Sequence, residues 1–348
     1  MPTLRQRVVA FAGGLRNIVR SLGATWQWTP PMRGPQTVLV TGASVGIGLE
    51  VARLLLAETE HRLVLTAREG SMGRFAEAGI EEGPRVRLRA LDVTSEEARD
   101  AVVAEIERDW GGVDILVNNA GLSVRAVVEH VTEEERLQQM AVNFRAPMAL
   151  TRRVLEGMRS KRAGRVINVS SVGGMSAMPT MAVYSASKFA LEGATESLWY
   201  EVRPWGIRVT LVQPGFINSD GFRKVHFTAQ GEQALADPDD PYHRHYRNME
   251  EMVERLMTLT WSTSHTVART IVRTMHRRHP PLRVAGTADA WLFDAARRFL
   301  PQRVFHLLLY AGLPRVWAWG PRRRERRTGG RKGVLVASRS APREVAAR

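Results

Sequence analysis

A regular alternation of apolar runs and amphipathic stretches fills most of the chain, and it constrains the fold more than any other feature. Short apolar runs of the kind buried on both faces of a sheet occur at 37–41, 62–67, 86–93, 114–120, 165–171, 207–214 and 282–286. Helical periodicity separates them at 47–55, 71–78, 95–109, 133–160, 184–203 and 265–278. This alternation predicts an α/β fold, in which helices cover both faces of a parallel sheet.

A glycine-rich turn, TGASVGIG (41–48), directly follows the first predicted strand and begins the next predicted helix. Backbone N–H groups and the positive end of the helix dipole therefore face one spot, which favours a phosphate group. The predicted phosphate-binding residues are Gly42, Ser44, Val45, Gly46, Ile47 and Gly48. The alternative is that the three glycines only shape a turn, since their spacing differs from the usual dinucleotide fingerprint.

A second motif, YSASK (184–188), lies at the start of a predicted helix. Residues four apart share one face of a helix, so Tyr184 and Lys188 are expected to point the same way. A nearby ammonium group lowers the pKa of a phenol from about 10 toward neutrality, which makes the tyrosine a usable general acid or base. Ser171 ends a predicted strand at the carboxyl edge of the sheet, where α/β proteins build their sites. Each residue alone would more often be an ordinary surface residue.

Taken together, these residues resemble the short-chain dehydrogenase/reductase family over 37–286. The matching motifs follow the family's order, and they are TGASVGIG (41–48), LDV (91–93), NNAG (118–121), Asn143 in VNF, Ser171 in NVSS, YSASK (184–188) and PGFI (214–217). The resemblance implies a Rossmann-like three-layer sandwich with a seven-stranded parallel sheet. It also implies a nicotinamide cofactor and hydride transfer between a carbonyl and an alcohol.

The resemblance further implies roles for individual residues. Tyr184 exchanges a proton with the substrate oxygen, and Ser171 hydrogen-bonds that oxygen. Lys188 holds the nicotinamide ribose and lowers the pKa of Tyr184, while Asn143 positions a water in the proton relay. The other expected cofactor contacts are Asp92 and Val93 at the adenine, Asn119, Ala120 and Gly121 at the ribose and sheet edge, Pro214, Gly215 and Ile217 at the nicotinamide, and Ser219, which keeps the hydroxyl of a common threonine.

The end of the second strand, LTAR, bears on the choice of cofactor. An acidic residue there accepts hydrogen bonds from the adenosine ribose and repels a 2′-phosphate. This chain has Ala67 at that position and Arg68 next, and a guanidinium matches the charge and geometry of a phosphate. We therefore predict a preference for NADP(H). NAD(H) is the alternative, because the acidic residue Glu69 comes next. In that case Arg68 is a solvated surface charge.

The formal net charge of +15 is concentrated at the two ends of the chain. Residues 1–36 hold five arginines and no acidic residue, and residues 315–348 hold eleven basic residues against Glu325 and Glu344. Because 37–314 is nearly neutral, we expect no specific nucleic-acid site on the domain. Basic ends on a neutral core favour an anionic membrane surface as a partner.

The same ends carry amphipathic segments. A helix is predicted over 3–22, followed by a proline-rich linker at 29–35. Apolar helices at 291–300 and 304–313 precede two tryptophans and an arginine cluster, an order typical of a membrane interface. Alternatively, the 3–22 helix packs on the domain's own surface, and the two later helices cover the substrate pocket or form the subunit interface of a homo-oligomer. No transmembrane helix is predicted, because no apolar run is long enough. No secretory signal is predicted, because Arg16 and Arg20 interrupt its apolar core.

These features divide the chain into four predicted parts, which are a basic amphipathic extension with its linker (1–36), an NADP-binding catalytic domain (37–286), an apolar helical extension (287–320) and a basic, disordered tail (321–348). Segment 216–263 interrupts the alternation and is predicted to form a substrate lid. One face of its helix carries Met249, Met252, Val253, Leu256 and Met257, either as an adaptable surface or as ordinary core packing. The chain has no cysteine, and we predict no metal site.

The leading functional hypothesis is an NADP(H)-dependent oxidoreductase of lipophilic alcohols or carbonyls, because the YSASK region and the apolar extension resemble members that act on steroids, retinoids or long-chain keto-lipids. We expect it to be cytoplasmic and peripherally associated with a membrane. One alternative is a cytosolic reductase of small soluble carbonyls. Another is a catalytically idle dinucleotide-binding interaction protein.

Overall fold

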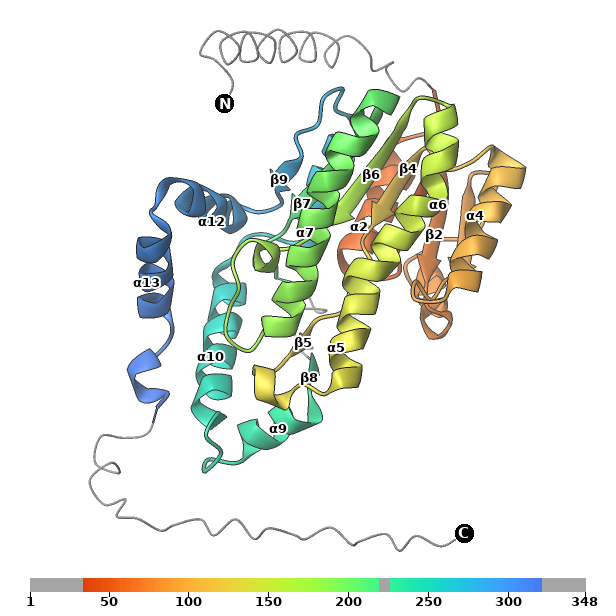
Figure 1. The fold of residues 1–348 in the computed structure, drawn as a ribbon. Helices are drawn as coiled ribbons and strands as arrows, with labels where there is room; N and C mark the ends of the chain where they lie inside the picture. Colours follow the sequence, from red (N-terminus) through yellow and green to blue (C-terminus); the bar gives the residue numbers. More distant parts are fainter. Residues whose placement is uncertain (1–33, 219–225, 321–348) are drawn as a thin grey trace, which may run out of the picture.

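Seven short apolar runs pair into one parallel sheet in the order β3-β2-β1-β4-β6-β7-β9 (Figure 1). The structure, a computed structural model, describes residues 34–218 and 226–320. The strands of the sheet are β1 (Thr37–Val40), β2 (Arg62–Ala67), β3 (Val86–Ala90), β4 (Ile115–Asn118), β6 (Gly164–Val169), β7 (Ile207–Gln213) and β9 (Arg283–Ala285). Strands β1, β4, β6 and β7 are buried along their whole length, as expected of strands covered on both faces. The predicted seven-stranded, Rossmann-like sandwich is confirmed.

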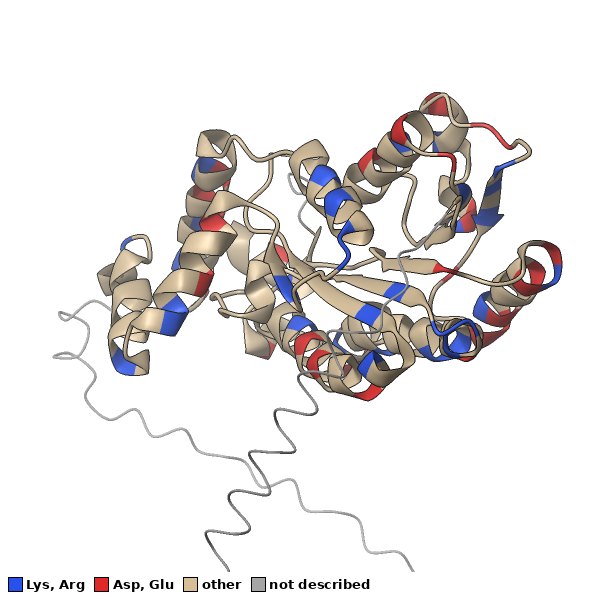
Figure 2. Cartoon of the chain, turned by 90° about the horizontal axis from the view of Figure 1, so that it is seen from above, with Lys and Arg blue, Asp and Glu red and all other residues tan. Residues whose placement is uncertain are grey.

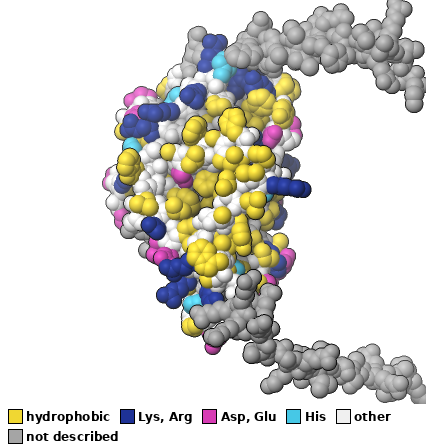
Figure 3. Space-filling view, turned by 90° about the vertical axis from the view of Figure 1, so that its left-hand side faces the viewer, with side chains coloured by type: hydrophobic (Ala, Val, Ile, Leu, Met, Phe, Trp, Pro, Cys, Tyr) yellow, Lys and Arg dark blue, Asp and Glu magenta, His cyan; other side chains and the backbone are white. Residues whose placement is uncertain are grey.

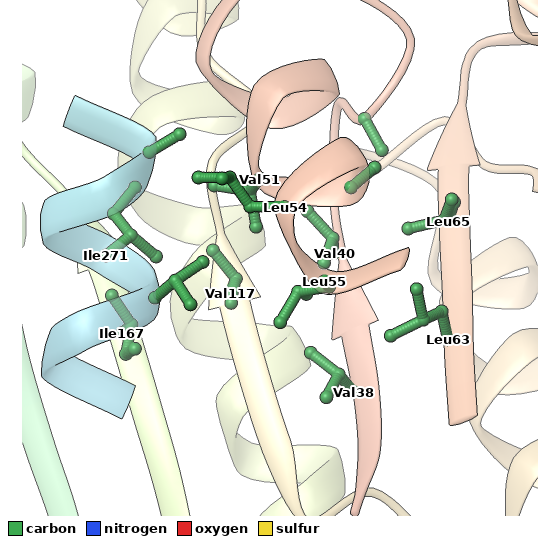
Figure 4. Close-up of a cluster of buried hydrophobic side chains, with 14 of the residues drawn as sticks. Val38, Val40, Val51, Leu54, Leu55, Leu63, Leu65, Val117, Ile167 and Ile271 are labelled. Carbon is green, nitrogen blue, oxygen red and sulfur yellow. The ribbon is translucent and has the colours of Figure 1, made fainter. Parts of the chain in front are cut away.

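Helices cover the two faces of this sheet and extend beyond one of its edges. They are α2 (Gly46–Glu58), α3 (Gly73–Glu77), α4 (Glu96–Trp110), α5 (Glu133–Met140), α6 (Ala146–Ser160), α7 (Ala182–Val202), α9 (Ala229–Ala236), α10 (His243–Leu259), α11 (Ser264–His276), α12 (Ala288–Phe299) and α13 (Gln302–Gly312). One core lies between the sheet and α2, α3 and α11, and a second lies between the sheet and α4, α6 and α7. Figure 4 shows Leu54 and Leu55 of α2 over Val38 and Val40 of β1, with Ile271 of α11 nearby.

The strand order reverses at β1, which pairs with β2 on one side and with β4 on the other. In open α/β sheets, the two loops that leave such a switch point run in opposite directions and leave a crevice at the carboxyl edge. The glycine turn follows β1 directly, so the fold places it in this crevice. The segments that follow β4, β6 and β7 reach the same edge.

Several element boundaries differ from the predicted ones for local reasons. The helix predicted over 133–160 is interrupted by a π-helical turn, Ala141–Arg145, which contains Asn143. Strand β4 ends early because the next two backbone N–H groups, those of Asn119 and Ala120, donate to the Thr41 hydroxyl. The third strand ends at Ala90 rather than at 93, and it is followed by a turn in which an aspartate side chain accepts a backbone N–H.

The lid segment and the C-terminal extension lie beside α7, at the edge of the sandwich that carries β7 and β9 (Figure 1). A small second sheet pairs β5 (Val124–Arg125) with β8 (His226–Phe227), and it joins the loop after β4 to the lid. Seen from above, basic and acidic residues are interspersed over the surface helices, and the charged residues on the strands are basic (Figure 2). Within the described residues, none of the helices has the length and hydropathy needed to span a bilayer.

Three predictions fall outside the described residues. They concern the amphipathic helix over 3–22 with most of its linker, the cofactor contact of Ser219, and the disordered tail 321–348.

Candidate active site

The glycine turn has a backbone shape that only glycine adopts readily. Gly42 and Gly46 have φ angles of +63° and +57°, in the left-handed region. A side chain at Gly48 would place its Cβ 2.2 Å from the Gly42 carbonyl oxygen, and one at Gly42 would lie 2.9 Å from the Cα of Ala120. The turn is therefore packed tightly against the end of β4, and the glycines do more than reverse the chain.

The N-terminus of α2 opens from this turn without a side-chain cap. Val45, the N-cap residue, is extended and exposed, and no side chain in the described structure accepts a hydrogen bond from the first turn as a cap. Ser44 is buried, while Gly46 is exposed and Ile47 half-buried. Uncapped N–H groups and the positive end of the helix dipole together favour an anion. The residues present therefore fit the pyrophosphate of a dinucleotide.

Asn119 holds the glycine turn in place from the end of β4. Its side-chain amide donates to the carbonyl oxygens of Thr41 and Gly42, both at 3.0 Å. The Thr41 hydroxyl accepts from the backbone N–H groups of Asn119 and Ala120 in return. The predicted cofactor residues Asn119 and Ala120 therefore lie beside the glycine turn, and Asn119 also holds the turn in its shape.

The ends of β2 and β3 bring Arg68 close to Asp92. Ala67, the last residue of β2, is buried, and Arg68 is exposed at the carboxyl edge. Hydrogen bonds from Thr94 lower the pKa of Asp92 most, and the Arg68 charge lowers it further. Val93 follows with its carbonyl held by a side-chain hydrogen bond from Arg99 at 2.7 Å. The edge thus presents an exposed cation directly after Ala67, the position where an acid would bind the ribose.

Ser171, Tyr184 and Lys188 come together at the same edge. Ser171 follows β6 and accepts a hydrogen bond from the backbone N–H of Gly173 at 3.0 Å. The ideal Cβ position of Gly173 lies 3.0 Å from Tyr184 Cε1 and 3.5 Å from Ser171 Oγ, so the phenol ring and the serine hydroxyl meet at this point. Lys188 lies one turn along α7, with its Nζ 5.9 Å from the centre of the Tyr184 ring. All three side chains are nine-tenths or more buried.

The electrostatics of this group correct one expectation. Burial raises the pKa of Tyr184, and the opposing influences are the hydrogen bond from Ser171 and the charge of Arg125. Lys188 was expected to lower the pKa of this phenol. Instead its ammonium donates to the Val169 carbonyl at 2.9 Å, and burial lowers its own pKa to about 8. Desolvation therefore outweighs the effect predicted from the helical spacing.

Asn143 is fully buried in the π-helical turn, and both atoms of its amide group have protein partners. Its Oδ1 accepts from the N–H of Leu122 at 2.8 Å, and its Nδ2 donates to the Leu122 carbonyl and to the Ser187 hydroxyl. These bonds fix the loop that begins at Gly121, whose own Cβ position lies near Asn143 and Lys188. The water-positioning role of Asn143 stays a prediction.

The loop after β7 is held by the C-terminal extension. The N–H of Gly215 donates to the Thr287 hydroxyl, and the N–H of Phe216 donates to Asp289, both at 2.8 Å. The Pro214 carbonyl accepts from Val172, which connects the loop to the strand end at Ser171. Ile217, the last residue of the motif, is buried.

Comparison with known proteins agrees with this geometry. The sequence profile of the short chain dehydrogenase family matches residues 36–229, more than half of the chain. The chain belongs to the short-chain dehydrogenase/reductase family. It is therefore an oxidoreductase of this family, whose members use a nicotinamide dinucleotide.

Relatives within the family cover most of the chain. A 3-ketodihydrosphingosine reductase from Bacteroides thetaiotaomicron is 34% identical over 279 residues, which cover 79% of this chain and 97% of that protein. Human retinol dehydrogenase 8 is 33% identical over 255 residues, which cover 72% and 80%. A solved short-chain dehydrogenase from Streptomyces avermitilis has a TM-score of 0.67 at 30% identity, and the match covers 80% of this chain and 97% of that one.

Sequence reasoning missed three residues of this site. Thr287 and Asp289 lie more than 70 residues beyond the loop they hold, and their positions at the start of the predicted apolar extension (287–320) gave no signal. Arg125 lies in the short strand β5 and acts on the Tyr184 phenol. An arginine among apolar and small residues, LSVRAVV, was the one available clue to its burial.

The lid helix α10 uses its apolar face for packing. Met249, Val253 and Met257 are buried, and Val253 and Met257 form a cluster with Phe216 of the loop after β7. Phe293 of α12 packs against the same cluster. The structure therefore favours the core-packing interpretation of these methionines over an open, adaptable surface.

Proposed function

We propose that this protein is an NADP(H)-dependent oxidoreductase that interconverts a carbonyl and a primary or secondary alcohol on a lipophilic substrate. The observation that carries the proposal is the buried group of Ser171, Tyr184 and Lys188, which lies at the same sheet edge as the uncapped N-terminus of α2. Proton-exchanging side chains and a dinucleotide cradle thus share one crevice.

In the proposed mechanism, the protein orients the reactants and handles the proton. A bound nicotinamide cofactor supplies or accepts the hydride. Tyr184 donates a proton to the carbonyl oxygen in reduction and takes one from the hydroxyl in oxidation. Ser171, whose hydroxyl lies beside the Tyr184 ring, holds the same substrate oxygen. Lys188 keeps its ammonium at the strand end, where the cofactor ribose is expected to lie.

Arg68 supports the choice of NADP(H) over NAD(H). Its guanidinium is exposed at the end of β2, and none of the ion pairs found within the described residues includes it. A 2′-phosphate on the adenosine ribose supplies a negative charge and several acceptor oxygens, which the planar, forked guanidinium binds well. The buried Ala67 offers the ribose no carboxylate in its place.

Two observations support a lipophilic substrate. The relatives named above include a 3-ketodihydrosphingosine reductase and a retinol dehydrogenase, whose names refer to lipophilic molecules. In addition, the described C-terminal extension exposes an apolar face, which Figure 3 shows as a broad group of hydrophobic side chains. This α12–α13 apolar face consists of Trp291, Leu292, Phe299, Val304, Leu307, Leu308, Tyr310 and Trp317.

The α12–α13 apolar face also suits a membrane surface. Arg297, Arg298, Arg303 and Arg315 are exposed on the same segment, so apolar and basic side chains alternate along it. Such a surface binds a bilayer by burying apolar area and by attracting anionic lipids. We therefore propose a cytoplasmic protein bound peripherally to an anionic membrane, from which it takes its substrate. A second copy of the chain is the competing occupant of this face.

Substitution of Tyr184 tests the proposed chemistry. Turnover is followed by the absorbance of NADPH with 3-ketodihydrosphingosine, retinal and a small soluble aldehyde. Tyr184→Phe should lower kcat by about 10²-fold or more, because the general acid is lost. Tyr200→Phe is the matched control, since Tyr200 lies on the same helix and is 62% exposed.

The same assay separates the alternatives. Full turnover by Tyr184→Phe contradicts the proton role. Turnover of the aldehyde alone favours the reductase of small soluble carbonyls. NADPH binding without turnover of any of the three compounds favours the idle dinucleotide-binding protein.

A further inference from the structure

A buried arginine near the proposed site has a side-chain nitrogen without a hydrogen-bond partner in the described structure. Arg125 is 5% exposed, and its Nε is buried without a hydrogen bond. No ion pair or hydrogen bond of its guanidinium occurs within residues 34–218 and 226–320. Burying a charged group without a partner costs free energy, so an unpaired buried nitrogen in a native fold calls for an explanation, such as a role in the active site.

The fold fixes Arg125 close to the start of α7. Strand β5 pairs with β8 of the lid, so that Arg125 lies opposite Phe227. The next residue, Ala126, forms a parallel bridge with Met181, which is the N-cap of α7 and lies three positions before Tyr184. The backbone is therefore paired at Arg125 and at Ala126, which holds this segment beside the start of α7.

Few charged groups surround this pair. On α7, Lys188 directs its ammonium to the Val169 carbonyl, away from a direct bond with the phenol. On α10, Glu250 is within electrostatic range of Arg125, and burial together with Glu254 raises its pKa. On α5, Gln139 accepts from the N–H of Val124 and is neutral. The Arg125 charge acts to lower the pKa of Tyr184, against the larger effect of burial. Of the two groups that act on Arg125, Glu250 acts more strongly than Tyr184. Lys188 Nζ lies 5.9 Å from the centre of the Tyr184 ring.

We propose that Arg125 is a positioning residue for proton transfer, whose buried positive charge stabilises the phenolate form of Tyr184. The partner that the guanidinium lacks is then the phenolate itself, which exists only while the proton is on the substrate oxygen or has left the site. A fixed cation in a site of low dielectric constant acts strongly on such a charge and needs no reorganisation. This inference rests on the proposed role of Tyr184 as the proton donor and acceptor.

The ionisation of Tyr184 can be measured directly in the full-length protein. Tyrosine labelled with ¹³C at Cζ reports each phenol separately by NMR, and Tyr184→Phe identifies the Tyr184 signal among the five tyrosines. Arg125→Met should raise the pKa of Tyr184 by about one unit or more, because a nearby cation is lost. Arg125→Gln, which keeps a polar side chain, should do the same, whereas Arg125→Lys should titrate close to the wild type.

The control is Arg74→Met, which removes an exposed arginine of α3 and should leave the titration unchanged. Circular dichroism confirms that each variant is folded. A Tyr184 titration that is the same in wild type, Arg125→Met and Arg125→Gln overturns the inference.

Kinetics gives a second readout and separates the two proposals. In the direction of alcohol oxidation, kcat/KM should rise with pH as the phenol ionises, and Arg125→Met should move this rise to higher pH. If wild type and variants share one pH profile, Arg125 has no such role even though the enzyme is active. If the wild type turns over no alcohol or carbonyl, the proposed function fails while the NMR result still decides the Arg125–Tyr184 coupling.

Discussion

The carboxylate of Asp289 accepts a hydrogen bond from the backbone N–H of Phe216 at 2.8 Å. Phe216 belongs to the loop that follows β7, and Asp289 belongs to the first turn of α12, beyond the last strand of the sheet. The fit is close, because a side chain at Gly215 would place its Cβ 1.9 Å from Asp289 Oδ2. The C-terminal extension therefore helps to set the shape of the loop expected to meet the nicotinamide.

Loss of this carboxylate should weaken cofactor binding. A hydrogen bond to a charged group contributes about 1.5–3 kcal/mol, so Asp289→Ala should raise the dissociation constant for NADPH about tenfold or more. Isothermal titration calorimetry measures the constant without a substrate. Asp294→Asn is the control, since Asp294 lies on the same helix and pairs with Arg298 at the surface. Equal NADPH affinity of the wild type and Asp289→Ala would show that the loop keeps its shape unaided.

Arg68→Ala should change cofactor selectivity. If the guanidinium binds the 2′-phosphate, its removal should weaken NADPH binding about tenfold or more and leave NADH binding nearly unchanged. The ratio of the two dissociation constants is the quantity to compare. Arg74→Ala, a nearby exposed arginine on α3, controls for a general loss of positive charge. An unchanged ratio in Arg68→Ala would mean that Arg68 is an ordinary surface charge.

The double substitution Leu307→Ser and Leu308→Ser should release the protein from membranes. Both side chains are more than half exposed on α13, so the change removes apolar area from the surface without opening a core. We expect the wild type to sediment with anionic vesicles and the variant to bind them several-fold less. Leu137→Ser on α5, also exposed, is the control. If the substitutions dissociate an oligomer and leave vesicle binding intact, the face is a subunit interface.

A pair of histidines should make stability depend on pH. The Nε2 atoms of His61 and His276 are 3.1 Å apart, and His61 Nδ1 accepts the N–H of Gln36. His61 Nδ1 is thus an acceptor, which leaves Nε2 to donate to His276. A histidine with one acceptor nitrogen and one donor nitrogen is neutral. Burial first, and then His276, lower the pKa of His61 below its usual 6.5.

Since the folded pKa of His61 is the lower one, the unfolded chain binds more protons as the pH falls below about 6.5. The contribution of this pair is therefore complete above that pH and is lost as the pH falls. The free energy of unfolding in urea should be smaller at about pH 5 than at about pH 7. His61→Gln should show a shallower pH dependence, and an identical slope in both proteins would exclude this histidine as the cause.

Features that are local in the sequence could be predicted well. The strand, glycine turn and helix around Gly42 are consecutive, so hydrophobic periodicity suffices to predict this turn and the helix N-terminus that follows it. Tyr184 and Lys188 are four residues apart on one helix, and the structure does bring them together with Ser171. The strand count and layer architecture followed from the same alternation.

Features that depend on tertiary contacts could not be predicted. Helical spacing places Lys188 near Tyr184 but does not reveal that both are buried or that the ammonium binds the Val169 carbonyl. The influence of Arg125 depends on a two-residue strand and one backbone bridge, which leave no periodic pattern. The bond from Asp289 to the loop after β7 joins residues 73 positions apart.

The bonds made by Thr287 and Asp289 also bear on how such enzymes diversify. Most of the residues expected to contact the cofactor follow strands of the sheet. The hydrogen bonds that hold the loop after β7, however, come from the segment that also carries the α12–α13 apolar face. A hybrid enzyme that receives the C-terminal extension of another family member should therefore also take over part of that member's cofactor affinity. Grafts made after Asp289 should keep the donor's surface and the recipient's cofactor affinity, whereas grafts made before Thr287 should alter both.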